Sequence, residues 1–279
     1  MIRIVTSIVL FLTATIAFAQ NFTGKATYKT HRKLDIKISE GENAPNSAIQ
    51  KQLHEQLKRQ FQRTFTLEFN NYESTYKQEA KLSAPQPTNG VTIQVFGNGG
   101  GTDVLYKNVK EGRYVNKTEI SGKRFLIKDK LPNYDWEMTG ETKTIGRYTC
   151  YKAERSREEE RRSFSVNEEG KEEDKTEKVT VKTVAWYTPE IPINNGPGMH
   201  WGLPGLILEI QEGKQTIVCS EIVINPSDKI VIEEPTKGKK VTQEKFDKIM
   251  DEKSKEMMER FKNKRRSKDG RSMSIEIQG

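Results

Sequence analysis

The sequence is poor in the residues that most enzymes use for catalysis. It has two cysteines and three histidines in 279 residues, and His31, His54 and His200 lie far apart along the chain. It contains no G-x-S-x-G nucleophile elbow and no H-E-x-x-H zinc motif. Serine and zinc hydrolases built on these templates are therefore disfavoured, and we expect no metal or other cofactor.

Apolar residues are also scarce. Only 33% of the residues are hydrophobic and 31% are charged, which is lean for a compact domain of this length. We therefore expect some segments to lie outside the core. One long apolar run occurs, at the N-terminus, and no second one follows it. We expect no transmembrane span after this run.

The N-terminal run has the three parts of a secretory signal peptide. Arg3 supplies the positive charge, residues 4–16 are mostly apolar, and Ala17-Phe18-Ala19 fits the small-x-small cleavage rule. The apolar run is shorter than the roughly 20 residues that cross a bilayer. A lipoprotein would need a cysteine at the cleavage point, and none is there. We predict cleavage after Ala19 and a secreted or periplasmic protein that is not a lipoprotein.

The two cysteines, Cys150 and Cys219, form an even pair in an oxidising compartment. A disulfide between them is one interpretation. Two buried free thiols are the other, because both lie in apolar runs typical of strands and a bridge needs Cα atoms within roughly 7 Å of each other. The sequence leaves both open.

The net charge of +8 suggests acidic partners such as lipid headgroups, because a positive surface attracts polyanions. However, the 47 basic residues are interleaved with 39 acidic ones. Basic stretches stand out only at residues 237–240 and 262–266. Together with secretion, this pattern makes a nucleic-acid partner unexpected.

Most of the chain from residue 20 to residue 236 alternates between apolar and polar residues. Ala26, Tyr28 and Thr30 show this period of two, which is typical of strands with one buried face. Segment 47–61 differs, because its apolar residues recur every four positions and predict an amphipathic helix. We predict a mainly β fold with α: a curved antiparallel sheet or half-barrel with two amphipathic helices packed on or beside it.

Three further segments complete the predicted organisation. Residues 154–178 are almost wholly charged and cannot bury enough apolar surface to form a core, so we interpret them as a long, mobile hairpin excursion. Apolar residues recur at three and four positions within 237–266 and predict a C-terminal helix. Its polar face is mixed in sign, which favours covering a sheet over binding a membrane. Residues 267–279 are predicted to be a flexible tail or an edge strand.

The segment from Trp186 to Glu209 contains an unusual density of prolines and glycines. Prolines fix φ and glycines permit conformations closed to other residues, so this loop is expected to have one defined shape. It is either a binding loop or a buried crossover at the end of the sheet, with Trp201 and Leu203 in the core, and both can hold together. The candidate binding residues are Trp186, Tyr187, Pro189, Glu190, Pro192, Met199, His200, Trp201, Leu203, Pro204 and Gly205.

These residues also carry a family resemblance. The stretches W-Y-T-P-E-I-P from Trp186 and G-L-P-G-L-I from Gly202 resemble the signature of the GLPGLI family of secreted Bacteroidetes proteins. The resemblance implies an envelope location, a TonB-dependent outer-membrane receptor as a partner, and no assigned activity. The W-x-x-x-x-E-T pattern from Trp136 is also similar to LolA-like lipoprotein carriers, which implies a half-barrel with helices over its concave face.

Three functions follow from these observations. The first is a noncatalytic envelope module that binds an apolar ligand, a peptide or an outer-membrane receptor. The second is a hydrolase of envelope or host polymers that uses carboxylates near the loop, with Glu190 and Glu209 as candidates. The third is a structural accessory that adds its C-terminal strand to a partner sheet.

Overall fold

The computed structural model describes residues 22–32, 62–79, 103–166 and 172–266. Three predicted segments lie outside these residues. They are the signal peptide at 1–19, the helix near 47–61 and the tail at 267–279.

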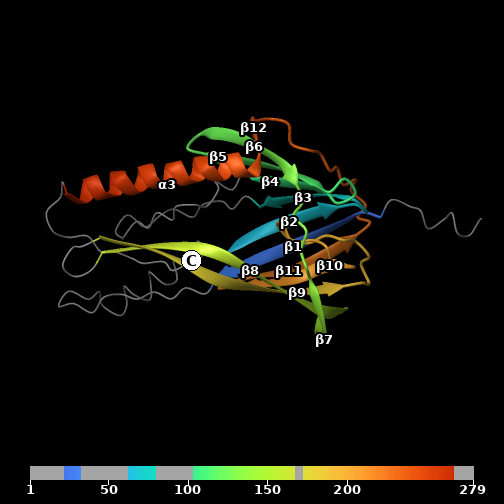
Figure 1. Cartoon of the computed structure of the whole chain (residues 1–279). Coiled ribbons are helices and arrows are strands. Elements are labelled where there is room, and N and C mark those ends of the chain that lie inside the picture. The colour runs from blue at the N-terminus through green and yellow to red at the C-terminus, as the bar shows by residue number, and fades with distance from the viewer. Residues whose placement is uncertain (1–21, 33–61, 80–102, 167–171, 267–279) are drawn as a thin grey trace, which may run out of the picture.

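Within the described residues, twelve strands form one open sheet (Figure 1). The strands are β1 (Gly24–Arg32), β2 (Arg63–Phe69), β3 (Glu73–Gln78), β4 (Val104–Asn108), β5 (Arg113–Ile120), β6 (Lys123–Lys130), β7 (Glu137–Ile145), β8 (Tyr148–Val166), β9 (Glu172–Thr188), β10 (Leu206–Glu212), β11 (Gln215–Ile224) and β12 (Lys239–Val241). Their order is β12-β6-β5-β4-β3-β2-β1-β11-β10-β9-β8-β7. The predicted mainly β fold is confirmed, and the sheet is open rather than closed.

The sheet joins two meanders. Strands β1 to β6 are consecutive neighbours in one half, and β7 to β11 are consecutive neighbours in the other. Pairing of β1 with β11 connects the halves, and β12 alone is parallel to its neighbour, β6. Figure 1 shows the sheet strongly curved, with β12, β6 and β5 at the top of the view and β9 and β7 at the bottom.

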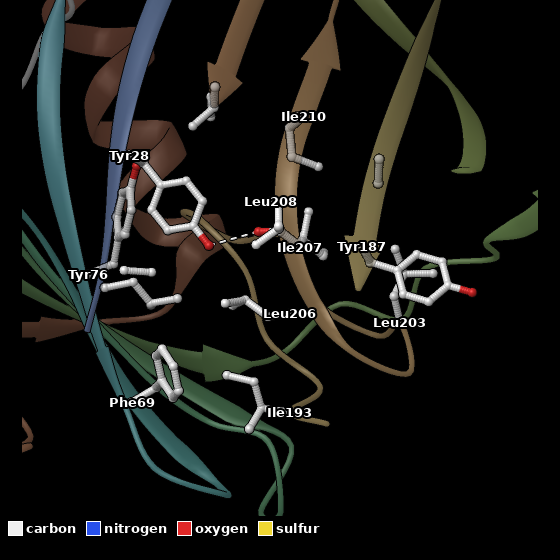
Figure 2. Packing of buried hydrophobic residues seen from close by; sticks show 14 of the residues in the cluster. Tyr28, Phe69, Tyr76, Tyr187, Ile193, Leu203, Leu206, Ile207, Leu208 and Ile210 are labelled. Atoms are coloured by element: carbon white, nitrogen blue, oxygen red, sulfur yellow. Dashed lines mark hydrogen bonds between the residues drawn. The ribbon is translucent and has the colours of Figure 1, made fainter. Parts of the chain in front are cut away.

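The period-two pattern places the core on one face of the sheet. In β1 the side chains of Ala26, Tyr28 and Thr30 are buried, whereas those of Lys25 and Lys29 are exposed. Because the sheet curves, residues of the two halves meet across this face. Figure 2 shows Tyr28, Tyr76 and Phe69 on one side and Ile193, Leu206, Leu208 and Ile210 on the other.

One buried hydrogen bond ties the two sides of this core together. The Tyr28 hydroxyl donates to the Ile207 carbonyl oxygen at 2.7 Å (Figure 2). The donor is on β1 and the acceptor is on β10, so this bond spans the strand β11 that lies between them in the sheet. A buried tyrosine hydroxyl needs such a partner, because an unpaired polar group in a core is costly.

Within the charged segment, residues 154–166 belong to β8 and residues 172–178 belong to β9. The two strands stay in antiparallel register from Tyr151 opposite Tyr187 out to Val166 opposite Glu172. Backbone pairing therefore continues well beyond the apolar part of these strands. Figure 1 shows the hairpin projecting past the rest of the sheet.

The helix among the described residues is α3 (Gln243–Arg266). The sequence predicted its start near residue 237, but Lys239 to Val241 instead extend the sheet as β12. Thr242 explains the later start: its hydroxyl accepts a hydrogen bond from the Lys245 amide at 3.3 Å, as an N-terminal cap does. Among the described residues, no helix is both long and apolar enough to cross a membrane.

Candidate functional site

The proline- and glycine-rich connection between β9 and β10, residues 189–205, is called the motif loop below. It lies against the core face, where Ile191, Ile193 and Leu203 join the main hydrophobic cluster. The structure divides the eleven candidate residues into three groups. Buried are Trp186, Tyr187, Leu203 and Gly205; half-buried are Met199, His200 and Trp201; exposed are Pro189, Glu190, Pro192 and Pro204. The loop is thus a crossover packed into the core, and a strip of it reaches the surface.

A buried lysine holds the tip of the motif loop. Lys107, on β4, has no exposed surface. Its ammonium group donates to the carbonyl oxygens of Gly196 at 2.8 Å, Gly198 at 2.7 Å and His200 at 3.2 Å. Burial lowers the pKa of Lys107 to about 7. These three bonds use all three donors of the ammonium group, so they satisfy both the lysine and the loop carbonyls.

A buried asparagine anchors the middle of the loop. The Asn195 side chain donates to the Ser74 hydroxyl on β3 at 2.9 Å and accepts from the Gly196 amide at 2.9 Å. Its backbone carbonyl accepts from the Ile207 amide at 3.0 Å. Asn195 therefore bonds the loop both to the opposite half of the sheet and to the start of β10.

Two tryptophans lock the loop to the segment that precedes β7. The Trp136 indole donates to the Trp201 carbonyl oxygen at 2.8 Å, and the Trp201 indole donates to the Pro132 carbonyl oxygen at 2.9 Å. Each indole nitrogen thus forms a hydrogen bond between the motif loop and the segment that precedes β7. Trp201 acts here as a structural residue, in agreement with the crossover interpretation.

A charged cluster lies beside His200. Arg155 and Arg157 on β8 share a strand face with Thr183 on β9 and Glu212 on β10. Arg157 donates two hydrogen bonds to the Glu212 carboxylate, at 2.9 and 3.1 Å, and the Thr183 hydroxyl donates a third at 2.5 Å. The Glu212 carboxylate therefore accepts three hydrogen bonds from side chains of the cluster.

Arg155 lies in an aromatic environment within this cluster. Its guanidinium carbon is 3.9 Å from the centre of the Tyr134 ring and 5.1 Å from that of Trp136. Such stacking is favourable for a partly desolvated guanidinium. Two buried atoms of the cluster have no hydrogen-bond partner within the protein: Nε of Arg155 and Nδ1 of His200. Nδ1 of His200 therefore has no hydrogen bond that would favour the charged imidazole.

The surroundings of His200 and Glu212 lower the pKa of both side chains. Burial lowers the pKa of His200 to about 4; the negative charge of Glu212 opposes this shift, and the positive charges of Arg155, Lys107 and Arg157 add to it. Burial alone would raise the pKa of Glu212, but the bonds from Arg157 and Thr183 lower it to about 2. His200 is therefore neutral and Glu212 charged at neutral pH.

We predict an acid-labile fold that depends on this pair. Below pH 6.5 the unfolded chain protonates its histidine while native His200 stays neutral, so stability falls as the pH drops from 6.5 toward 4. Glu212 adds a second loss from pH 4.5 toward 2, because its native carboxylate resists protonation. Urea unfolding at a series of pH values measures both effects. His200→Gln should flatten the first window, by at most about 3 kcal/mol. The part of the second window that comes from the bonds of Glu212 to Arg157 and Thr183 should remain. An unchanged slope above pH 4 would contradict the assignment.

The two carboxylates suggested for hydrolysis both have structural partners. Glu190 accepts a hydrogen bond from the Thr149 amide at 2.9 Å. Glu209 forms an ion pair with Lys143 at 2.7 Å, and that ammonium lies 4.3 Å from the centre of the Trp186 ring. The pair thus bonds β10 to the edge strand β7 and covers Trp186.

The cysteines do not form the disulfide that was one of the two interpretations. Both are free thiols, on β8 and β11, and β9 and β10 separate these strands in the sheet. Burial raises the pKa of Cys150 to about 11 and that of Cys219 to about 12. A thiol is a good nucleophile only as the thiolate, so neither environment activates the sulfur. Within the described part of the chain, no three His, Cys, Asp or Glu side chains gather as a metal site would require.

Sequence reasoning found the motif loop but missed the residues that hold it. Lys107, Arg155, Arg157 and Glu212 were not among the candidates. One signal existed: Lys107 follows Leu105 on the same face of an apolar strand, where a lysine is unusual. The arginines and Glu212 gave no comparable signal, because they lie in or beside a stretch crowded with charges.

A family model matches part of the chain. Residues 136–209 match the model of a family described as "Protein of unknown function (Porph_ging)". The matched segment begins at Trp136 and includes the motif loop. No curated protein matches the chain.

Among solved structures, the chain is similar to two described as the structure of PNGF-II, in the P21 and C2 space groups. The sequence identities are 14% and 12% and the TM-scores are 0.47 and 0.46. Each comparison covers 81% of this chain and 32% of the other. The chain thus spans about a third of the length of those proteins, and at these values the likeness carries no functional argument.

Proposed function

We propose that the chain is a noncatalytic binding module of the cell envelope, of the GLPGLI type, that docks a protein partner with the exposed strip of its motif loop. One observation carries this proposal. The loop is bonded to the body of the protein through the Gly196 carbonyl and the Asn195 side chain, yet Pro189, Pro192 and Pro204 stay exposed and Met199 is half-buried. A rigid apolar strip held in one shape loses little entropy on binding.

This proposal favours a partner on the outside of the loop over a ligand on the core face. Leu203, Leu206 and Ile207 are completely buried there, within the main hydrophobic cluster, and Figure 2 shows Leu203 beside Tyr187. The hydrolase alternative has less support, because Glu190 and Glu209 already bond to Thr149 and Lys143.

Site-specific photo-crosslinking tests the proposal in the native envelope. A photoreactive amino acid at position 192, and separately at 199, should give one discrete adduct with an envelope protein such as an outer-membrane receptor. Tyr72, which is 52% exposed and far along the chain from the loop, provides a matched control position. Equal adducts from all three positions, or none from 192 and 199, would reject docking through the loop.

The outer edge of β7, which pairs with no further strand of the described residues, supports a second candidate, addition of a partner strand to the sheet. This strand ends the sheet order, and most of its side chains are exposed. An edge strand presents unpaired backbone groups to other chains. Position 142 on β7 can be included in the same crosslinking series. An adduct from 142 without one from 192 would favour strand addition over loop docking.

The envelope location belongs to the proposal and has a separate test. Its support is the charged, apolar and small-residue pattern of residues 3–19. The mass of the chain recovered from its native source should correspond to a start at Gln20. A chain that retains residues 1–19 would contradict cleavage.

A further inference from the structure

Helix α3 is attached to the sheet by its first turns. The Phe246 ring meets the Phe125 ring of β6 edge-on, with the centroids 5.6 Å apart. Gln243 accepts a hydrogen bond from the Tyr114 hydroxyl at 2.7 Å and donates its amide hydrogen to Asp129 at 3.0 Å. Beyond these contacts the helix runs past the ends of β5 and β6, in the same direction as the β8–β9 hairpin (Figure 1). The predicted packing beside the sheet thus applies to the start of the helix, and covering the sheet does not explain the rest of its length.

The apolar stripe of α3 is longer than its anchor. At about 100° per residue, five apolar positions fall within about 60° of the Phe246 direction. They are Phe246, Ile249, Met250, Met257 and Phe261. The first three are half-buried, and the sequence carries the stripe a further three turns along the projecting part. Burying such a stripe requires an apolar surface that runs alongside the helix.

Charge divides α3 into two parts. Residues 243–256 hold four basic and five acidic residues, and two of the acids pair within the helix: Glu244 with Lys248 at 2.8 Å and Glu256 with Lys253 at 2.6 Å. Residues 257–266 hold five basic residues and one acidic residue. The helix dipole accounts for basic residues in the last turn, from 263 onward, but not for Arg260 and Lys262.

We propose that α3 is an interfacial helix that docks the protein on an anionic lipid surface. The apolar stripe would lie at the level of the acyl chains, and the basic end of the helix would face the phosphates. Charge selects this occupant, because the projecting end of the stripe is strongly basic and an anionic bilayer combines an apolar interior with negative headgroups. The near-neutral first half then serves as the joint to β6. This docking is independent of the motif loop, which belongs to the other half of the sheet.

Vesicle binding tests the proposal directly. The chain from Gln20 onward should co-sediment with phosphatidylcholine vesicles that contain phosphatidylglycerol, and much less with phosphatidylcholine alone. Each basic residue near an anionic surface contributes about 1 kcal/mol, so the triple variant Arg260→Glu, Lys262→Glu and Lys264→Glu should lower the partition coefficient roughly 100-fold or more. Circular dichroism of the variant checks that it still folds.

A second triple variant separates the helix from general electrostatic attraction. Lys237→Glu, Lys239→Glu and Lys240→Glu change the net charge by the same amount at exposed positions before α3. This control should retain most of the binding. Equal losses in the two triple variants, or equal binding to neutral and anionic vesicles, would overturn the proposal. The double variant Met257→Ser and Phe261→Ser should also weaken binding to anionic vesicles. An unchanged partition coefficient would show that the apolar stripe does not contribute to this binding.

Discussion

Gly205→Ala is expected to lower the free energy of unfolding by about 3 kcal/mol or more. A Cβ at this position would lie 2.2 Å from the carbonyl oxygen and 2.5 Å from the carbonyl carbon of Thr188. Both atoms belong to the backbone at the end of β9, so no side chain can rotate to relieve the contact. Leu206 pairs directly with Thr188, which means that the clash would push apart the first pair of the β9–β10 ladder.

Urea unfolding followed by tryptophan fluorescence measures this loss. Gly213→Ala is the matched control, because Gly213 has a φ of 56° and nothing within 4 Å of the added Cβ. It should lower the free energy of unfolding by only about 1 kcal/mol, because alanine is disfavoured in the left-handed backbone conformation. If both alanine variants lose the same stability, close packing against Thr188 is not the reason for glycine at 205.

Lys107→Met is expected to cost about 3 kcal/mol. Methionine keeps most of the buried apolar stem but removes the donors to the carbonyl oxygens of Gly196, Gly198 and His200. The Gly196 bond is buried, so its carbonyl loses its partner without gaining water. We expect looser packing around Trp201, seen as a change in near-UV circular dichroism.

Two comparisons test the reason for this loss. Lys77→Met removes a half-exposed lysine that pairs with Glu68 on the neighbouring strand, and it should cost no more than about 1 kcal/mol. Because burial lowers the native pKa of Lys107 to about 7, the unfolded chain binds more protons between pH 7 and 10.5. The stability of the original protein should therefore rise across this range relative to Lys107→Met. A constant difference between the two would contradict the lowered pKa of Lys107.

The sequence revealed the strands and the defined loop because both depend on local patterns. Alternation at Ala26, Tyr28 and Thr30 is enough to predict a half-buried strand, and closely spaced prolines and glycines are enough to predict a fixed backbone. The start of α3 was misplaced because Lys239 to Val241 pair with β6, a contact that no local pattern reveals. The first predicted helix lies outside the described residues and stays a prediction.

The supporting residues of the site could not be predicted for a similar reason. Lys107 is 89 residues from Gly196 and meets it only because the curved sheet brings β4 opposite the loop. Glu212 and Arg157 are 55 residues apart and meet through strand register. Such pairs depend on the topology of the whole sheet, whereas the sequence pattern reports only on neighbours along the chain.

The anchoring of the motif loop also determines whether the segment that contains it could be transferred to another protein. The segment that carries the family match, residues 136–209, contains the loop but none of the side chains that bond it from the other half of the sheet. Lys107, Ser74 and Tyr28 all precede this segment, and each bonds to a residue within it. The matched segment is therefore not a transferable unit. Grafted onto another sheet it would lack the donors for its own carbonyls, so the loop and the first six strands must vary together.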